Sequence, residues 1–398
     1  MLPLVRARDR GLALELAYGC LRLERRLDTW IESFTDRPLA RIDGAVLDWL
    51  RLGLYQLKEL RVPDHAAVAE TVRHARRSMD AGRAGFVNAV LRAATTDPDS
   101  DPFPSRDTDP LGYLTTWGSH PEWLVSRWLA RWGLHDTLRL VKAGNTAPPV
   151  ILRSLDGAPG PVPEGIELTP VPGWPGSFEL ARGSPSEALA TVGGVIQDPA
   201  AAAVVDYVGD EIAGPVYDAC AAPGTKTMGV ATRARGAVIA ADISRARLGR
   251  VPMSAGRLGL AVAVAVMDAR RPALSSARTV IADVPCTGTG VLRRRPDARW
   301  RIDESGLAGL VELQRQILDG VAGIVEKGGV LVYSTCSLEP EENEMQIEAF
   351  LDRHPEFARD PNTGCPVPHG CLDDAGDLFV RPWLTGTDGS YAARLRRV

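Results

Sequence analysis

The sequence predicts an α/β protein, with a doubly wound parallel sheet in its C-terminal half and an all-helical region at its start. Three observations support this prediction. Short apolar runs alternate with helix-like stretches after residue 197, which is the pattern of repeated β-α units. Apolar residues recur at helical spacing over the first 95 residues or so. Prolines and glycines are frequent between residues 147 and 176, which favours a small connecting module between two larger parts.

The all-helical region is assigned to residues 1–140. A loop rich in proline, aspartate and serine at 95–102 ends its first part, and a further helix with three tryptophans is predicted over 121–141. The connecting module is assigned to residues 141–195, with one predicted strand at Val150–Leu152.

The remaining part, residues 196–398, is predicted to hold the parallel sheet. Its predicted strands are Val216–Cys220, Val238–Asp242, Ala261–Val266, Thr279–Asp283 and Val330–Tyr333. The intervening helices are predicted at 226–234, 245–258 and 307–325, and a last helix follows at 339–351. Pro340, Glu341 and Glu342 are expected in the first turn of that last helix, where proline and acidic residues are favourable.

Two cysteine-bearing loops follow two of these strands. Asp283–Cys286 comes directly after one apolar run, and Ser334–Ser337 comes after the other. Ligands and catalytic groups collect at the carboxyl ends of parallel strands, so we expect both loops at one edge of the sheet. A single cysteine is most often a small buried hydrophobic residue. Two cysteines beside an acid favour nucleophilic catalysis instead.

The loop Asp218–Thr227 joins the first strand of the sheet to the next helix. Its small residues and Gly224 let the backbone approach a ligand closely. The loop lacks the contiguous Gly-Lys-Ser/Thr of a P-loop and the G-x-G-x-x-G of a dinucleotide fold. Asp242 and Asp268 end the next two strands, and an acid at such a position suits ribose hydroxyls. Together these features predict an adenosine-containing ligand.

Charge is uneven along a chain whose net charge is −4. Arginines crowd the segment directly behind the Cys286 loop, and we expect them to contact phosphates rather than to form only a solvated face. They are Arg293, Arg294, Arg295, Arg299 and Arg301.

Other classes of protein are disfavoured. No apolar run reaches the ~18 residues that a membrane span needs, and Met1–Arg10 lacks the apolar core of a signal peptide, so a cytoplasmic protein is expected. The 6 cysteines lack the regular spacing of a disulfide framework, and no metal site is predicted.

Three long motifs carry a resemblance. In order and spacing, Asp218–Thr227, Asp283–Trp300 and Tyr333–Glu344 resemble successive motifs of S-adenosylmethionine-dependent RNA cytosine-5 methyltransferases, the Nop/Sun family. The resemblance covers nearly the whole chain and implies a Rossmann-like methyltransferase domain. Thr225 stands where the family usually has glycine, which is expected to tighten the cofactor loop without abolishing binding.

The N-terminal region is similar to the helical domain of the antiterminator NusB, at Glu15–Gly19, Leu52–Leu57 and Phe86–Arg92. Family members with such a domain methylate small-subunit (16S) ribosomal RNA, which is therefore the implied substrate. The chain begins where this domain should already be under way. Its first helix or two are therefore expected to be missing, through genuine shortening or a start codon assigned too late.

The resemblance also implies residue roles. Cys336 is the expected nucleophile that adds to cytosine C6, and Cys286 the group that assists release. Asp283 is expected to hydrogen-bond the cytosine ring edge, and Lys226 to orient the base or lower the pKa of the nucleophile. Asp242 would bind ribose and Asp268 the adenine edge. The complete expected cofactor set is Cys220, Ala221, Ala222, Pro223, Gly224, Thr225, Lys226, Asp242, Asp268 and Asp283.

Alternatives remain open at this point. The same chemistry could act on another RNA such as tRNA, or the chain could be a non-catalytic NusB-like RNA-binding factor. A DNA cytosine methyltransferase would use the cysteine after Pro285 as its nucleophile and lack the second one. A monomer without a stable protein partner is expected.

Overall fold

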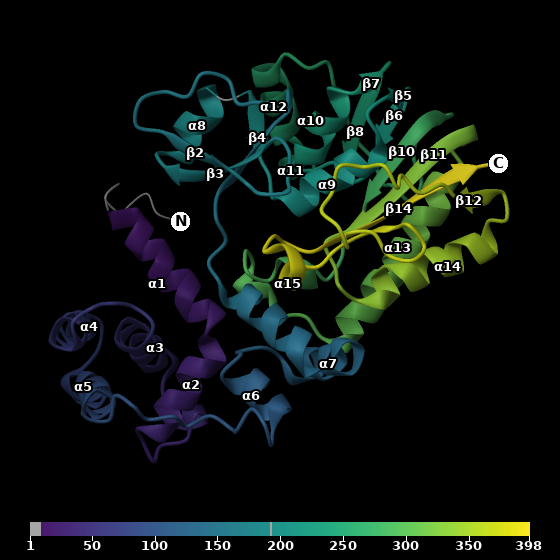
Figure 1. Cartoon of the computed structure of the whole chain (residues 1–398). Coiled ribbons are helices and arrows are strands. Elements are labelled where there is room, and N and C mark those ends of the chain that lie inside the picture. The colour runs from purple at the N-terminus through teal and green to yellow at the C-terminus, as the bar shows by residue number, and fades with distance from the viewer. Residues whose placement is uncertain (1–8, 192) are drawn as a thin grey trace. The chain divides into compact units, whose positions relative to one another are not determined.

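The computed structural model describes residues 9–191 and 193–398, which divide into two compact units (Figure 1). One unit comprises Met1–Ala147 and Arg293–Arg301, and the other comprises Pro148–Leu292 and Ile302–Val398. The predicted shortening of the helical domain concerns the start of the chain, which lies outside the described residues. Over the described ranges, no helix is both long enough and apolar enough to cross a membrane.

The first unit is all-helical, as predicted, and is drawn in purple to blue in Figure 1. Aspartates cap three of its helices, because the side chains of Asp43, Asp80 and Asp109 accept hydrogen bonds from backbone N–H groups of the first turns. Leu27, Leu50 and Leu91 are completely buried in its core. Its helices are α1 (Arg10–Arg22), α2 (Glu24–Ser33), α3 (Gly44–Lys58), α4 (Asp64–Ser78), α5 (Ala81–Thr96), α6 (Pro110–Thr116) and α7 (Glu122–Asn145).

Arg299 is an internal component of this helical unit. Its guanidinium donates to the carbonyl oxygens of Arg22 at 2.8 Å and Ser119 at 2.7 Å. It also donates to Asn145 Oδ1 at 2.9 Å and to the Gly144 carbonyl at 3.0 Å. The side chain thereby ties the end of α1 to the end of α7. Burial, together with the nearby positive charge of Arg22, lowers the pKa of Arg299 to about 9.

The predicted phosphate contact of Arg299 is therefore wrong. Its side chain is fully buried, and Arg293 is buried as well, so neither offers a guanidinium to an external phosphate. The density of arginines in the segment indicated a charged surface, but two of the five side chains lie inward. Arg294 is partly exposed, and Arg295 and Arg301 are exposed.

The connecting module contains a small antiparallel sheet with the strand order β2-β3-β1-β4 and one short helix. Its elements are β1 (Ile151–Ser154), β2 (Glu167–Pro170), β3 (Ser177–Arg182), α8 (Pro185–Thr191) and β4 (Gly194–Ile196). The predicted strand at Val150–Leu152 corresponds to β1. In the structure this module belongs to the second compact unit, and the three-domain division of the chain stays a prediction.

The main sheet has the strand order β12-β14-β11-β10-β6-β8-β9, with β13 paired to β14. Five neighbouring strands are parallel, as predicted: β6 (Val216–Asp218), β8 (Val238–Asp242), β9 (Ala263–Val266), β10 (Ala277–Asp283) and β11 (Val325–Thr335). The antiparallel strands beyond β11 were not predicted: β12 (Phe357–Arg359), β13 (Leu378–Val380) and β14 (Ser390–Arg397). Two short strands, β5 (Ile212–Ala213) and β7 (Ala234–Arg235), pair separately.

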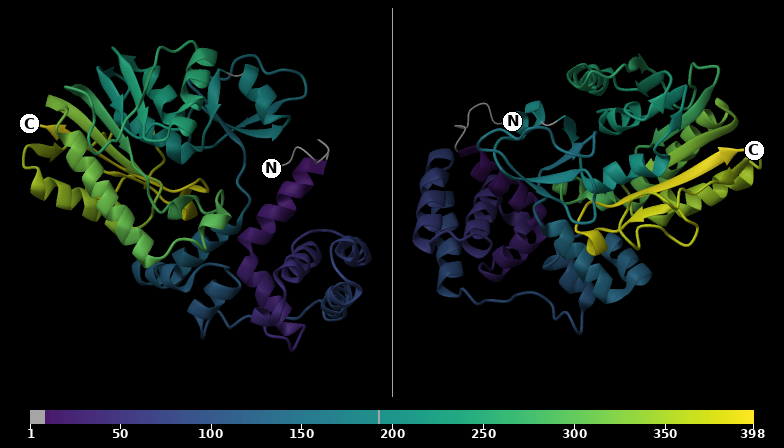
Figure 2. Two further views of the ribbon diagram at one scale, coloured as in Figure 1. Left: turned by 180° about the vertical axis from the view of Figure 1, so that it is seen from behind. Right: turned by 45° about the horizontal axis from the view of Figure 1, so that its top comes forward.

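Helices cover both faces of the main sheet, which makes it doubly wound. One face packs on α9 (Pro199–Val208), α10 (Thr225–Ala231), α11 (Arg245–Leu248) and α12 (Arg250–Leu258). The other face packs on α13 (Glu304–Ala322) and α14 (Glu344–Arg353), which lie in front of the strands in the left view of Figure 2. The final short helix is α15 (Pro382–Thr385).

The predicted start of the last large helix is wrong. Residues Pro340–Glu342 form a separate 3₁₀ turn, and Asn343, at φ −115° and ψ −108°, interrupts the chain before α14 begins at Glu344. Acidic residues at a helix start normally face water, where they favour the helix dipole. Glu342 is instead completely buried. Its position bears on the candidate active site described below.

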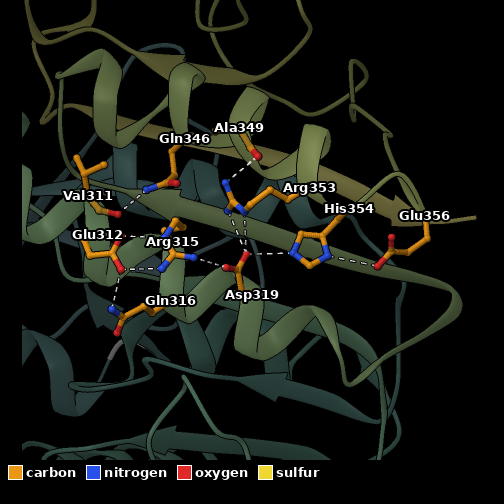
Figure 3. Close-up of polar contacts among 10 residues, drawn as sticks. All are labelled: Val311, Glu312, Arg315, Gln316, Asp319, Gln346, Ala349, Arg353, His354 and Glu356. Atoms are coloured by element: carbon orange, nitrogen blue, oxygen red, sulfur yellow. Dashed lines mark hydrogen bonds and ion pairs between the residues drawn. The ribbon is translucent and has the colours of Figure 1, made fainter.

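An ion-pair network joins α13 to α14 (Figure 3). Asp319 on α13 accepts from Arg315 at 2.8 Å, and from Arg353 and His354 at 3.0 Å each. The His354 ring also stacks on Phe350 with ring centroids 4.4 Å apart. Burial alone raises the pKa of Asp319, but hydrogen bonds from His354 and Arg353 outweigh it, so the pKa lies below its ordinary value.

This network predicts an acid-sensitive contribution to stability. A carboxyl group whose pKa is lower in the folded chain stabilises the fold above its ordinary pKa, and the contribution is lost as pH falls through the folded-state value. Because the group is partly exposed, we expect Asp319→Asn to cost about 1 kcal/mol at neutral pH. The difference from the wild type should therefore shrink as pH falls below about 4. Urea unfolding across that range measures it, and a pH-independent difference would contradict the prediction.

Candidate active site

The two cysteine loops meet at one edge of the main sheet. Strands β10 and β11 are parallel, and their register pairs Asp283 with Ser334, so both chains leave the sheet at the same level. The Sγ atoms of Cys286 and Cys336 lie 3.3 Å apart. The backbone N–H of Cys336 also points to the Cys286 sulfur, at 3.3 Å. The structure thus brings together the two thiols that the sequence placed at adjacent strand ends.

Asp283 and Lys226 form an ion pair beside the cysteines. Lys226 Nζ lies 2.7 Å from Asp283 Oδ2, and the Ser334 hydroxyl donates to Asp283 Oδ1 at 2.8 Å. Burial lowers the pKa of Lys226, but the charge of Asp283 and the hydrogen bond to it outweigh that effect, so the pKa is raised. Lys226 therefore stays an ammonium group, and it fixes the Asp283 carboxylate at the strand end.

The environment makes the two thiols different. The hydrogen bond with Cys336 and burial together raise the pKa of Cys286 well above its ordinary value. A thiol that keeps its proton acts as a donor, so Cys286 is suited to donate to the Cys336 sulfur. The thiolate is the nucleophilic form of cysteine. With its proton held in this way, Cys286 is poorly suited to be the nucleophile of the pair.

The loop before α10 requires glycine at one position. Gly224 has φ +105°, and a Cβ atom added there would lie 2.9 Å from Val251 Cγ2. A side chain would therefore strain the backbone and collide with α12. The neighbouring residue Ala221 is held by a hydrogen bond from its N–H to the Ala241 carbonyl at 2.8 Å. The loop is thus kept close to the end of β8.

Asp242 lies at that end of β8 and is almost fully buried. Its carboxylate accepts from the N–H groups of Ala222 at 3.3 Å and Ser244 at 2.7 Å. It also pairs with Arg247 at 3.0 Å, whose side chain is largely exposed. Asp242 therefore holds the Gly224 loop in place, and its contact with Arg247 is the one nearest to solvent.

Asp268 follows β9 at the same edge of the sheet and is bound by Arg270 at 2.7 Å. The hydrogen bonds from Arg270 lower the pKa of Asp268, so this carboxyl is ionised. The structure shows no contact of Asp268 with the Gly224 loop or the cysteines among the described residues. Cys220 is mostly enclosed, and burial raises the pKa of its thiol, which argues against a reactive role.

The sequence interpretation missed two buried acids near this edge. Asp218, at the end of β6, is fully buried, and burial raises its pKa to about 7. Thr227 donates to its Oδ2 at 2.6 Å, while its Oδ1 has no partner. Glu342 contacts the Cys286 loop through Thr287. Asp218 is the first residue of the Asp218–Thr227 motif, which was interpreted only through its small residues. Glu342 was predicted to lie in the first turn of a helix.

Models of three known families match this chain. The family described as 16S rRNA methyltransferase RsmB/F matches residues 205–396. The NusB family matches residues 4–96. A ferredoxin-like domain of RsmF/B-like methyltransferases matches residues 120–154. These matches confirm the prediction of a NusB-like helical domain followed by a methyltransferase domain.

Similar proteins cover nearly the whole length. A probable ribosomal RNA small subunit methyltransferase B from Bacillus subtilis is 33% identical over 98% of this chain and 91% of its own. A ribosomal RNA small subunit methyltransferase B from Salmonella arizonae is 34% identical over 98% of this chain and 90% of its own. Among solved structures, that of PH0851 covers 99% of this chain and 91% of its own, with a TM-score of 0.77 and 23% identity, which supports the fold.

Proposed function

The chain belongs to the RsmB/F family of 16S rRNA methyltransferases, and from that premise we propose that it methylates carbon 5 of a cytosine in 16S rRNA. The proposed reaction proceeds through a covalent bond between Cys336 and cytosine C6. The family depends on S-adenosylmethionine, which supplies an electrophilic methyl group on a sulfonium. The observation that carries the proposal is the 3.3 Å contact between Cys286 and Cys336 beside Asp283.

The reaction requires a nucleophile from the enzyme because cytosine C5 is itself too weak a nucleophile to attack the methyl group unaided. A Cys336 thiolate forms a bond to C6, the π electrons of the C5–C6 double bond move to C5, and C5 becomes the electron-rich carbon of an enamine. After C5 has taken the methyl group, its proton must leave. The C6–S electron pair returns to Cys336 as the double bond re-forms. Cys286 is proposed to assist release by donating a hydrogen bond to the departing Cys336 sulfur, and Asp283 hydrogen-bonds the ring during attack.

The residues around Gly224 fit the expected cofactor. The positive φ of Gly224 and its contact with Val251 exclude a side chain there, and the bare backbone lets a ligand approach the loop closely. Asp242 would accept the ribose hydroxyls and Asp268 the adenine edge. The remaining expected contacts are Cys220, Ala221, Ala222, Pro223, Thr225, Lys226 and Asp283.

Asp242→Ala is expected to weaken cofactor binding by about tenfold to a hundredfold, because two ribose hydrogen bonds to a charged acceptor are lost. Isothermal calorimetry with S-adenosylhomocysteine measures the change. The control is Asp210→Ala, whose carboxylate is exposed and lies 3.8 Å from the Arg233 guanidinium. Unchanged affinity in Asp242→Ala would show that ribose is bound elsewhere.

The proposed RNA surface consists of Arg294, Arg295 and Arg301 together with the helical unit. Phosphate contacts would make RNA binding weaken steeply with salt. A cytosine in structured RNA must leave its stack to reach Cys336. Ribosomal RNA as substrate implies work in the cytoplasm, and a monomer is the proposed form.

Denaturing gel electrophoresis tests the covalent step. Cys286→Ala is incubated with S-adenosylmethionine and unmodified 16S rRNA, and a slowly migrating protein–RNA adduct is expected. The Cys286→Ala/Cys336→Ala double variant should give none, because it lacks the attacking sulfur. Wild-type protein should methylate without accumulating the adduct.

Two outcomes would count against this proposal. An adduct that persists without Cys336 would reassign the nucleophile. Absence of an adduct with 16S rRNA, together with its formation on a tRNA, would keep the chemistry and change the substrate.

A further inference from the structure

A buried polar clamp holds the Cys286 loop from both sides. Gln314 on α13 donates from Nε2 to the carbonyl of Pro285 at 3.0 Å, directly before the cysteine. Glu342 accepts from the backbone N–H of Thr287 at 2.9 Å, directly after the cysteine, and also from the Thr287 hydroxyl. Gln314 and Glu342 are joined at 2.8 Å. The two residues that flank Cys286 are therefore bound to one connected pair of side chains.

The clamp is an unusual use of a charged group. The side chains of Glu342 and Gln314 are both completely buried. A buried carboxylate is costly unless hydrogen-bond donors compensate it, and Glu342 has three such donors. Apolar packing could hold a loop without this cost. The use of a buried carboxylate instead indicates that the position of the Cys286 loop must be closely defined.

The Cys336 loop is held by different contacts. Asn343, the residue after Glu342, accepts from the Thr335 hydroxyl at 2.6 Å and donates to the Ser337 carbonyl at 3.0 Å. The Cys336 carbonyl accepts from the Gly290 N–H at 2.9 Å. Two consecutive residues of the turn after β11 thus serve different cysteines: Glu342 holds the loop of Cys286, and Asn343 holds the loop of Cys336.

We propose that Glu342 and Gln314 are positioning residues for the release step, which keep Cys286 in place against the covalent intermediate. The inference rests on the proposed function, in which Cys336 attacks and Cys286 assists release. It assigns Glu342 and Gln314 to Cys286 and not to Cys336. Loosening the clamp should leave attack by Cys336 largely intact, because β11 and Asn343 still hold that residue. It should slow departure of the Cys336 sulfur from C6, so that the Cys336–C6 bond persists.

Two substitutions loosen the clamp in different ways. Glu342→Gln keeps the shape of the side chain but removes the charge and sets an amide group among three donors. Gln314→Met keeps the volume and leaves the Pro285 carbonyl without its donor. The matched control is Gln346→Met, because Gln346 on α14 is also buried and donates from Nε2 to the Val311 carbonyl at 2.8 Å without touching either cysteine loop.

The experiment measures adduct and turnover together on the full chain, with S-adenosylmethionine and the RNA that the wild type methylates. Glu342→Gln and Gln314→Met should accumulate the protein–RNA adduct, as Cys286→Ala does, and lower steady-state turnover by roughly tenfold to a hundredfold. The single-turnover methylation burst should remain. Gln346→Met should show no adduct. If one clamp variant fails to fold, as judged by thermal melting, the other carries the test.

The outcomes separate this inference from the proposed function. An adduct with Cys286→Ala but with neither folded clamp variant would overturn the positioning role and leave the function standing. Adduct accumulation with Gln346→Met would also overturn it, since general loosening of the α13–α14 region would then be the cause. If Cys286→Ala itself forms no adduct while the wild type methylates cytosine, the covalent assignment and the positioning role both fail.

Discussion

Lys226→Met is expected to lower single-turnover methyl transfer by about two to four orders of magnitude, the range typical for loss of a positioned proton-transfer or charge-stabilising group. The ammonium of Lys226 lies 2.7 Å from Asp283 and is largely enclosed. Without it, the Asp283 carboxylate loses its charged partner and one of the two contacts that fix its orientation. A carboxylate turned away from the ring would not stabilise the positively charged form of the cytosine.

The effect of Lys226→Met should appear mainly in the methylation rate. Single-turnover transfer of a labelled methyl group measures that rate, and calorimetry with S-adenosylhomocysteine reports the cofactor affinity separately. Lys226→Met/Asp283→Asn removes both charges, so it should regain thermal stability without regaining activity. A Lys226→Met variant with near-normal methylation would show that Ser334 alone suffices to orient Asp283.

Arg299→Met is expected to lower the free energy of unfolding of the helical unit by about 3 kcal/mol. Four oxygen atoms lose their donor, two in buried and two in partly buried contacts, and each buried one costs about 1–3 kcal/mol before relaxation. Relief of repulsion from Arg22 and Arg26 offsets part of this loss. Urea unfolding of the full chain, followed by the helical circular dichroism signal, measures the effect.

Arg301→Met is the matched control for Arg299→Met. Arg301 belongs to the same short segment, but its side chain is exposed and pairs with Asp297 on the surface. An exposed ion pair contributes little, so the change should stay within about 0.5 kcal/mol. The two variants also separate stability from RNA binding, since Arg301→Met alone is expected to reduce the salt dependence of RNA affinity. Equal stability losses would contradict the internal role of Arg299.

Much of the catalytic half could be predicted from the sequence because each parallel strand is an apolar run that ends in a polar or glycine-containing loop. That rule placed Cys286 and Cys336 at one edge of the sheet before any geometry was known. It missed β14, where Arg394 and Arg396 flank Leu395, Arg397 follows directly, and the three arginines obscure a strand that is largely buried. Long side chains can carry their charge to the periphery while the backbone lies inside.

The remaining errors have a common cause. Local sequence gives the kind of residue but not the direction in which its side chain points. Glu342 has the composition of an exposed helix start, yet the 3₁₀ turn before α14 directs it into the interior. Arg299 has the composition of an RNA-binding run, yet it meets carbonyl groups that lie more than 150 residues away in the sequence. Only the folded backbone brings such partners together.

The return of Arg293–Arg301 to the helical unit limits how the protein can be dissected. The polypeptide passes from one unit to the other after Ala147, after Leu292 and again after Arg301. A fragment ending at Ala147 would lack Arg299, and the four oxygen atoms that accept hydrogen bonds from its guanidinium would lose their donor. A fragment starting at Pro148 would contain Arg293–Arg301 without the helices that this segment packs with in its own unit. Separately expressed halves are therefore poor substitutes for the whole, and a helical half intended for study alone should have Arg293–Arg301 joined to it by a linker.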